Sequence, residues 1–219
     1  MPITEIASFP VKDGVNTEAL FDKASGSELS VLMQDWSRYL HKHKGLHGAK
    51  LGMKVEDASS LVVVMGMTGT IFRATSHAIV GERVGLLIAP TGADMYHVEL
   101  EPYEDVQRAT SSPFTAITFF QFDGDPPNDY LERARAFRQA GLKESGPKPL
   151  CGAYGITHEE VETEDTSGKA VVFIAGWESV EAHEAFKASK TFKEFMPRLV
   201  DGVQKVGVYH VPFRKVEAP

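Results

Sequence analysis

Two tripeptides of identical sequence carry the residues best suited to chemistry in this chain, Tyr96-His97-Val98 and Tyr209-His210-Val211. Imidazole exchanges a proton near neutral pH, and a phenol can donate a hydrogen bond to a developing oxyanion. A histidine next to a tyrosine on a strand therefore predicts proton transfer to or from a small molecule. The alternative is structural: a pair that recurs at equivalent positions would stabilise a seam through hydrogen bonds.

The alternation of side chains along a strand assigns these residues to faces. We expect Tyr96, Tyr209 and His47 to face helices, where a ligand cavity would lie. His97 and His210 would then point the other way, toward a seam between sheets. All five are interpreted as candidate catalytic residues.

His47 is the preferred base because the two halves of the chain differ there. The equivalent position in the second half holds Cys151. An asymmetry of this kind indicates that one half holds the active cavity and the other acts as a scaffold. The alternative is an ordinary histidine at a strand end. Cys151 has no basic neighbour in the sequence, so it is interpreted as a small buried residue and not as a nucleophile.

Aromatic and histidine side chains are expected to form the wall of the cavity. The predicted substrate-binding residues are Trp36, Tyr39, Tyr154 and His183. Trp36 lies in an apolar helical stripe, so core packing explains it equally well. His183 lies near a helix start, where packing is again an alternative.

No metal or organic cofactor is predicted. His41, His43 and His47 cluster in sequence, but Gly45 interrupts a spacing that zinc sites usually keep regular. Glycine-rich phosphate loops, serine-nucleophile motifs and dinucleotide fingerprints are absent from the sequence. Haem ligation by His183 or His77 is kept as an alternative.

The strands that must position these residues occur twice in the same order, which indicates an internal repeat. Each copy ends with its Tyr-His-Val strand. The preceding strands pair off as residues 4–9 with 115–120, the segments beginning at 47 and 151, and residues 61–67 with 171–177.

Helices are expected between these strands. The clearest is a helix with a stripe of apolar residues at helical spacing, beginning after Ser27 and ending by Gly45. Its counterpart runs from about Asn128 to Gly141. A further helix is expected from Ser179 to Gly202, with a counterpart at residues 71–87.

Each copy therefore reads β-α-β-β-α-β, a ferredoxin-like arrangement with strand order 4-1-3-2. Several strands are apolar on both faces, so the bare face of each sheet needs a cover. We expect an α+β fold with a first repeat at residues 1–105, a linker at 106–113 and a second repeat at 114–219. The two sheets would close into one α+β barrel inside a single chain.

Barrel closure would bring strand four of each copy toward strand two of the other. We therefore expect His47 to approach Tyr209 and His210. By the same reasoning, Tyr96 and His97 would approach Cys151 and Tyr154.

Composition excludes several classes of protein. The 219 residues are 42% hydrophobic and 24% charged, as in a globular protein, and the net charge of -7 argues against nucleic acid or an anionic membrane as partner. No apolar run is long enough to span a bilayer, and the first residues do not form a secretory signal. A single cysteine fits a reducing compartment, so a cytoplasmic location is expected.

The segment from Ala170 through Trp177, Ser179 and His183 to Phe186 resembles the third strand and following helix of the dimeric α+β barrel superfamily, in its antibiotic-biosynthesis-monooxygenase-like group. The opening Pro2–Ile6 segment and the tandem layout resemble two-repeat members from fungi. The resemblance implies the barrel fold. Its members include cofactor-free oxygenases acting on phenolic polyketides, isomerases, cyclases, dehydratases and haem-degrading enzymes, so the fold alone does not decide the reaction.

The expected function is cofactor-independent acid/base catalysis, a cyclisation or isomerisation of an apolar phenolic or polyketide-type small molecule in secondary metabolism. The alternatives are a cofactor-free monooxygenase acting on a phenol, a non-enzymatic ligand-binding or stress-response barrel, and a haem-binding protein. One chain would suffice for barrel closure, and a homodimer remains compatible with it.

Overall fold

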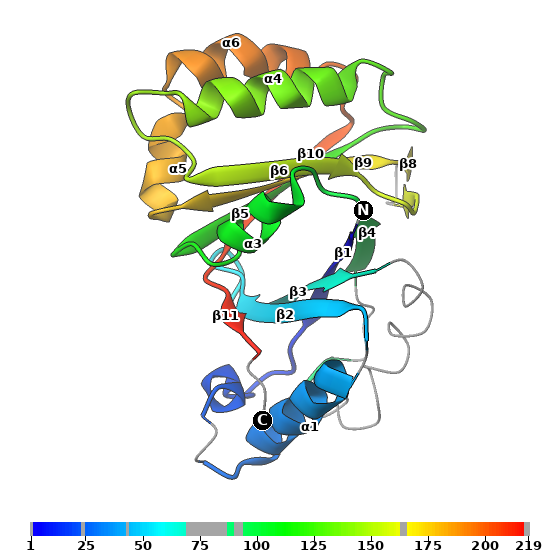
Figure 1. The fold of residues 1–219 in the computed structure, drawn as a ribbon, viewed down its shortest axis with the longest axis vertical. Coiled ribbons are helices and arrows are strands. Elements are labelled where there is room, and N and C mark those ends of the chain that lie inside the picture. Colours follow the sequence, from blue (N-terminus) through cyan, green and yellow to red (C-terminus); the bar gives the residue numbers. More distant parts are fainter. Residues whose placement is uncertain are drawn as a thin grey trace. The chain divides into compact units, whose positions relative to one another are not determined.

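The computed structural model describes residues 2–22, 25–42, 44–68, 87–89, 94–162 and 166–216. The chain divides into two compact units, and each is described by itself (Figure 1). The first unit comprises Met1–Met95 together with Arg214–Pro219, and the second comprises Tyr96–Phe213.

The first unit is a sheet with a helix on one face. Its elements are β1 (Ile3–Pro10), the 3-10 helix η1 (Thr17–Leu20), α1 (Glu28–Lys42), β2 (Leu46–Met53), β3 (Ser60–Met67), the start of β4 (Asp94–Val98) and β11 (Arg214–Lys215). The hydroxyl of Ser27 accepts a hydrogen bond from the backbone N–H of Ser30 at 3.2 Å, which caps α1 where the sequence predicts its start. The helix expected at residues 71–87 lies, except for Leu87, outside the described residues.

The strand order of this sheet is β11-β2-β3-β1-β4, and β4 continues into the second unit at Tyr96. Strands four, one, three and two of the first repeat are thus arranged in the predicted order. The pairing of β2 with β3 is irregular between Leu46 and Gly48, so His47 is the extra residue of a bulge.

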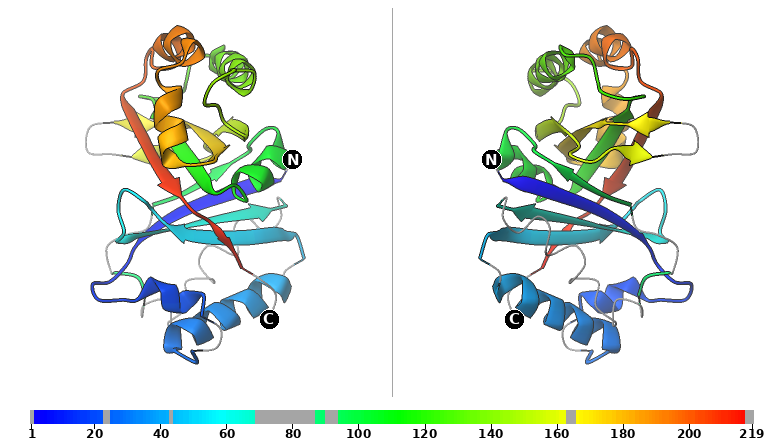
Figure 2. Two further views of the ribbon diagram at one scale, coloured as in Figure 1. Left: turned by 90° about the vertical axis from the view of Figure 1, so that its left-hand side faces the viewer. Right: turned by 90° about the vertical axis from the view of Figure 1, so that its right-hand side faces the viewer.

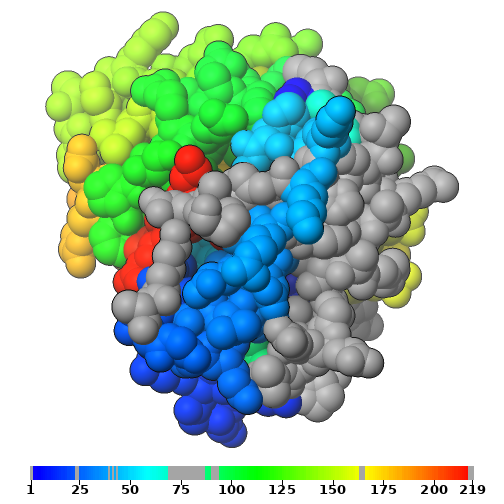
Figure 3. All heavy atoms as spheres, turned by 60° about the horizontal axis from the view of Figure 1, so that its bottom comes forward, coloured from blue at the N-terminus to red at the C-terminus, as the bar shows by residue number. Residues whose placement is uncertain are grey.

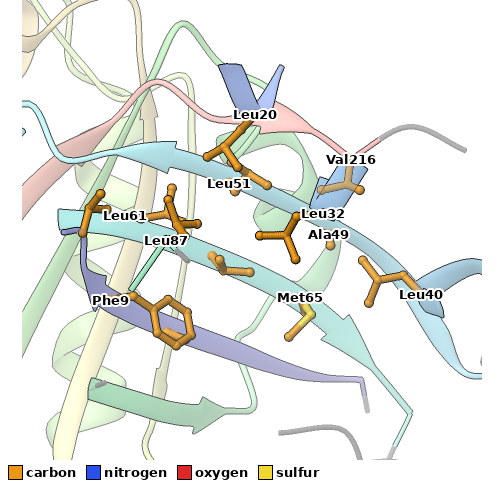
Figure 4. Packing of buried hydrophobic residues seen from close by; sticks show 13 residues of the cluster. Phe9, Leu20, Leu32, Leu40, Ala49, Leu51, Leu61, Met65, Leu87 and Val216 are labelled. Carbon is orange, nitrogen blue, oxygen red and sulfur yellow. The ribbon is translucent and has the colours of Figure 1, made fainter. Parts of the chain in front are cut away.

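The core of the first unit lies between α1 and the sheet. Residues with the same alternation on β1, β2 and β3 point toward the helix (Figure 4). The close-up labels Phe9, Ala49, Leu51, Leu61 and Met65 on the strands, Leu32 and Leu40 on α1, and Leu20, Leu87 and Val216 around them. Burial of this apolar surface is what holds the helix against the sheet.

The second unit has the same plan with additional elements. These are α3 (Tyr103–Ala109), β5 (Phe114–Gln121), α4 (Tyr130–Leu142), β6 (Cys151–Ile156), β7 (Val161–Glu162), β8 (Ser167–Gly168), β9 (Ala170–Trp177), α5 (Val180–Phe186), α6 (Lys190–Leu199) and β10 (Lys205–Val211). The four-stranded sheet has the order β10-β5-β9-β6, again 4-1-3-2. Figure 2 shows α4, α5 and α6 on one side of this sheet.

Two expectations need correction in the second unit. The segment predicted to be a linker, residues 106–113, contains most of α3, which packs against β6 and β9 because Val106 and Ala109 are buried. The single helix expected between Ser179 and Gly202 is two helices. Ser179 caps α5 as predicted. Ser189 caps α6, since its hydroxyl accepts a hydrogen bond from the backbone N–H of Phe192.

Within the ranges given above, none of the helices combines the length and the apolar character that a bilayer crossing requires.

Candidate functional site

A cavity of about 210 Å³ lies in the second unit, between its sheet and its helices. The strands contribute the floor, and α4, α5 and α6 contribute the walls and roof. The lining residues used below are Ala116, Arg138, Gly152, Phe173, Trp177, His183, Phe186 and Phe192. This is the helix-facing side of the sheet, where a ligand cavity was expected.

Aromatic rings form most of the cavity wall. Phe137 of α4 is central to them, with ring centroids 6.1 Å from Phe173 on the sheet and 6.1 Å from Phe186 on α5. Phe192 of α6 lies 6.4 Å from the same ring. Such a wall favours a planar, mainly apolar ligand, since aromatic pairs are attractive in offset and edge-on geometries.

Two histidines form the polar end of this cavity. His183 of α5 lines it, and His210 of β10 lies behind His183, with 2.6 Å between Nδ1 of His183 and Nε2 of His210. Both residues are buried. One ring must donate and the other accept, so the tautomers of the two imidazoles are coupled. The pair can therefore present either a donor or an acceptor at the second nitrogen of His183.

The indole of Trp177 orients His183. The two rings are stacked, with 4.5 Å between centroids and 24° between planes. Trp177 ends β9 and is buried, and its Nε1 atom has no hydrogen-bond partner among the described residues. The imidazole of His183 is thus held between a flat apolar surface and the ring of His210.

An ion-pair network borders the cavity at β6. Asp105 of α3 is buried and accepts hydrogen bonds from Arg138 at 2.5 Å and from Arg108 at 2.7 Å. The guanidinium of Arg138 also donates to the carbonyl of Gly152. Burial alone would raise the pKa of Asp105, but the hydrogen bonds from Arg138 and the Gly152 N–H, with the charges of both arginines, hold that pKa below its ordinary value. The Arg138 side chain is consequently fixed at the cavity edge.

The structure brings together His183 and His210, which the sequence analysis had assigned to different roles. It also corrects the predicted faces. His210 points toward the helices, since it bonds to His183 on α5. Tyr209 lies on the other face, where its ring stacks on Phe119 at 6.1 Å, and Tyr96 lies 5.1 Å from the same ring.

His97, the counterpart of His210, has a carboxylate partner instead. Its Nδ1 lies 2.5 Å from Oε1 of Glu159, and its backbone N–H donates to Oε2 of the same residue at 2.9 Å. This contact joins β4 to the segment after β6. It matches the structural alternative for the repeated motif, a histidine that stabilises a seam.

Tyr154 is buried on β6 and does not line the cavity. Its hydroxyl donates to Glu101 at 2.9 Å and accepts from Nε of Arg135 at 3.2 Å. Burial, with the charge of Glu101, raises the pKa of the phenol above its ordinary value even though Arg135 opposes the rise. The structure therefore gives Tyr154 a bonding role at the edge of the sheet, and its predicted contact with substrate is not supported.

The catalytic role of His47 stays a prediction, but the structure corrects the position on the strand that this prediction assumed. His47 is exposed on β2, at the bulge. Besides β3, β2 pairs with β11, in a register that matches Arg214 with Leu51 and Lys215 with Lys50. A bulge turns a side chain out of the alternation that the prediction assumed.

Trp36 packs against the core of the first unit, as its position in the apolar stripe of α1 indicated. The side chain of Tyr39 lies outside the described residues, as do His77, His43 and the side chain of His41. Among the residues that are described, no group of three or more histidine, cysteine or acidic side chains is arranged to hold a metal ion. Cys151 is buried, and burial raises the pKa of its thiol.

A haem group does not fit the cavity as it stands. His183 is the one ring that could ligate iron there, through the nitrogen not bonded to His210. The volume of about 210 Å³ is below the roughly 300–1,000 Å³ that ligand sites of drug size occupy. A macrocycle would require the phenylalanine wall to move.

Sequence reasoning missed Phe137, Arg138 and Asp105 as parts of this site. Phe137 lies in a helix that was expected, but it was not interpreted as part of a cavity. Asp105 was assigned to the end of the first repeat, and no spacing in the sequence relates it to Arg138. The acidic residue in the first turn of a short amphipathic helix was the one available signal.

No protein-family model matches the chain, and no curated protein is significantly similar to it in sequence. Solved structures are similar in fold. A chlorite dismutase-like protein named TA0507 superposes with a TM-score of 0.63 at 11% identity, over 98% of this chain and 95% of its own. A protein of Fusobacterium nucleatum, provisionally named a monooxygenase, gives 0.59 at 14% identity over 97% and 92%. An anthrone oxidase-like protein gives 0.56 at 13% identity over 98% and 93%.

These similarities show the fold alone, which is α+β and ferredoxin-like. Identities of 11–14% carry no information about the reaction.

Proposed function

We propose that the cavity of the second unit binds a small, largely apolar, oxygenated aromatic molecule and that the His183–His210 pair exchanges a proton with it. The observation that carries this proposal is the 2.6 Å contact between the two imidazoles at the end of an aromatic cavity. The favoured reaction is a cofactor-independent isomerisation or cyclisation of a phenolic or polyketide-type compound.

The proton transfer proceeds through His183, because His183 lines the cavity and His210 lies behind it. The imidazole of His183 accepts a proton from an acidic C–H or a phenolic O–H, and the electron pair stays on the substrate as an enolate or phenolate. Return of the proton to a different atom completes an isomerisation, and attack of the enolate carbon on a carbonyl completes a cyclisation.

His210 acts as a positioning residue in this scheme. In one tautomer it accepts the Nδ1–H of His183, which leaves the other nitrogen of His183 free of a proton and basic. In the other tautomer it donates, and His183 carries the proton to be returned. Coupling of this kind lets one site act as base and then as acid without solvent in the cavity.

The aromatic wall supplies binding and excludes water. Rings of Phe173, Phe186 and Phe192 surround an apolar body, and a stacked Trp177 limits rotation of His183. Arg138, fixed by Asp105 and Gly152, adds a positive charge at the border of the cavity, which favours a substrate that becomes an anion.

The test is hydrogen–deuterium exchange at carbon in enolisable aromatic ketones, with anthrone and 2-tetralone as probes. Incubation in D₂O followed by mass spectrometry reports proton abstraction for any substrate of this class. We expect the protein to accelerate deuterium uptake and to be saturated by the ketone. Unchanged exchange rates together with no binding of either ketone would remove the proposal.

A cofactor-free monooxygenase is the second candidate, supported by the aromatic cavity and by the names of two proteins with similar folds. There the substrate carbanion passes electrons to dioxygen. One oxygen atom enters the product as a carbonyl and the other leaves as water. An oxygen electrode separates the two: uptake of one O₂ per anthrone favours the monooxygenase, and exchange without uptake favours the isomerase or cyclase.

A non-enzymatic ligand-binding or stress-response barrel is the remaining alternative. Binding of anthrone without exchange or oxygen uptake would favour it.

We also propose that the two sheets close into one barrel within a single chain. Support comes from strands that continue beyond their own sheet. Val98, the last residue of β4, forms a bridge with Thr157, which follows β6, and Glu101 forms a bridge with Tyr154 of β6. The strand after β10 is β11, which pairs with β2. Amide exchange at residues 98–101 as slow as that of β6 is expected, and rapid exchange there would contradict closure.

A further inference from the structure

A second cavity, of about 560 Å³, lies in the first unit between η1, α1 and β11. Its lining residues are Leu20, Phe21, Ser30, Met33, Gln34, Ser37, Arg38, Arg214, Lys215 and Val216. This volume is within the range of small-molecule sites. Figure 3 shows η1 and α1 in blue on the face that comes forward.

Positive charge dominates the polar part of this cavity. The described residues that line it include Arg38, Arg214 and Lys215 and no carboxylate. The chain as a whole carries a net charge of -7, so a wholly cationic lining departs from the surrounding protein. Lys215 also pairs across the strands with Lys50, whose pKa is lowered by burial and by the charge of Lys215. Arg38 and Arg214 are each paired with a carboxylate outside the lining, Asp35 at 2.8 Å and Glu18 at 2.9 Å, so an anion would chiefly relieve the repulsion between Lys215 and Lys50.

The guanidinium of Arg214 is held in place before any ligand arrives. Its Nη1 and Nη2 atoms donate to the two carboxylate oxygens of Glu18 at 2.9 and 3.2 Å. Its central carbon lies 4.4 Å from the centroid of the Phe21 ring. Two of the five N–H donors are used and the plane is fixed by stacking, so the remaining N–H groups are offered at little entropic cost.

Ser30 is an independent sign that a polar group is missing. It lines the cavity, is 1% exposed, and its hydroxyl has no hydrogen-bond partner among the described residues. Buried hydroxyls are normally paired, so an unpaired one that lines a cavity is suited to donate to a ligand oxygen.

The remaining lining is apolar. Leu20 and Val216 belong to the core cluster of the first unit and lie on either side of Leu51 in Figure 4. Phe21 and Met33 complete an apolar side. A ligand that matches both the cationic and the apolar parts of the cavity lining has a hydrophobic body and one anionic group.

We propose that this cavity is a binding site for a small carboxylate with an apolar body, with Arg38 and Arg214 attracting the carboxylate and Ser30 donating to it. The site is separate from the cavity of the second unit and does not depend on the function proposed there.

The test uses phenylacetate and its neutral isostere phenylacetamide on the full-length ¹⁵N-labelled protein, monitored by amide chemical shifts. Phenylacetate should shift amides of residues 18–38 and 214–216 with saturation, and phenylacetamide should bind at least tenfold more weakly. Raising the KCl concentration should weaken the binding of phenylacetate and leave that of phenylacetamide unchanged.

Three variants at the site and one control variant localise the binding. Arg214→Gln and Arg38→Gln should each weaken phenylacetate binding about five- to tenfold, and Arg198→Gln, an exposed arginine of α6, should leave it unchanged. Ser30→Ala should weaken binding about threefold while raising the Tm of the free protein, because it removes the unpaired hydroxyl.

Equal affinity for the amide and the carboxylate would overturn the proposal. So would an absence of shifts at millimolar phenylacetate, shifts confined to the lining of the second unit's cavity, or binding unaffected by both arginine variants.

Discussion

The two Tyr-His-Val strands show how one tripeptide acquires two chemistries. In β4, His97 contacts the carboxylate of Glu159, and this contact joins two segments. In β10, His210 contacts another imidazole, that of His183, and this second ring lines a cavity. The role of each histidine therefore depends on the side chain that it contacts in a neighbouring element. It does not depend on the sequence of the strand that carries the histidine.

The two histidine contacts also differ in their exposure to solvent. Glu159 is 38% exposed, so the His97 contact lies close to solvent. His183 and His210 are buried beneath α5 and beside Trp177. Two buried rings in contact can pass a proton to a ligand, whereas a contact between an imidazole and a partly exposed carboxylate stabilises structure.

The largest effect is expected from removing the cavity histidine. His183→Ala should lower the rate of deuterium exchange into anthrone about 10²–10⁴-fold, the usual contribution of a general base. His97→Ala is the matched control and should change this rate less than threefold. Equal losses in both variants would show that the two motifs do not differ in function.

A glycine-to-alanine substitution in β6 tests how closely this strand approaches the residues that follow β4. The contact of His97 with Glu159 depends on this approach. A Cβ on Gly155 of β6 would lie 2.2 Å from the carbonyl oxygen of Glu99, which follows β4. Gly155→Ala should therefore cost about 3 kcal/mol of unfolding free energy in urea titrations. In the control Gly152→Ala the new Cβ would have its nearest neighbour at 3.4 Å, and a loss below about 1 kcal/mol is expected. Similar losses in the two variants would contradict the approach of these segments.

The carboxylate on the cavity side should matter more than the one beside His97. Asp105→Asn should lower the free energy of unfolding by about 2 kcal/mol. This is less than the roughly 3–5 kcal/mol typical of a broken buried ion pair, because the side chain of Arg108 is largely exposed and stays solvated. The pKa of Asp105 is held below its ordinary value of 3.8 in the folded protein. The contacts of ionised Asp105 therefore stabilise the folded protein fully above pH 3.8. This stabilisation is lost as the pH falls through the pKa that Asp105 has in the folded state. Urea titrations at pH 7 and pH 3 should show the difference between wild type and variant shrinking, and a constant difference would refute this assignment.

The smallest effect is expected at the surface-proximal histidine contact. Glu159→Gln retains a hydrogen-bond acceptor for the N–H groups of His97, so a loss of at most about 1 kcal/mol is predicted from thermal unfolding. Glu162→Gln on β7 is an exposed control and should be neutral. A loss as large as that of Asp105→Asn would mean that the two carboxylates are equivalent.

Strand positions and sheet order could be predicted from the sequence because apolar runs and their repetition are local properties. The strands that end with Met67 and Trp177 were expected at the residues where the structure has them. The caps Ser27 and Ser179 were likewise predictable, since capping depends on residues within one turn.

The faces of the strands and the partners of polar side chains could not be predicted in this way. A face assignment depends on which side the helices cover, and for β10 the prediction chose the wrong one. The His183–His210 contact joins residues 27 positions apart through tertiary packing. The bulge at His47 results from backbone pairing with β3, and the one local signal of it is the adjacent Gly48, which has a φ of 130°.

The most direct test of the paired-histidine account is ¹⁵N NMR of the imidazole nitrogens while anthrone is added under nitrogen. We predict that the signals of His183 and His210 shift together with the same saturation curve, as a shared proton moves, while those of His97 remain where they were. Saturable binding of anthrone that leaves both His183 and His210 unchanged, or that moves His97 instead, would contradict the account.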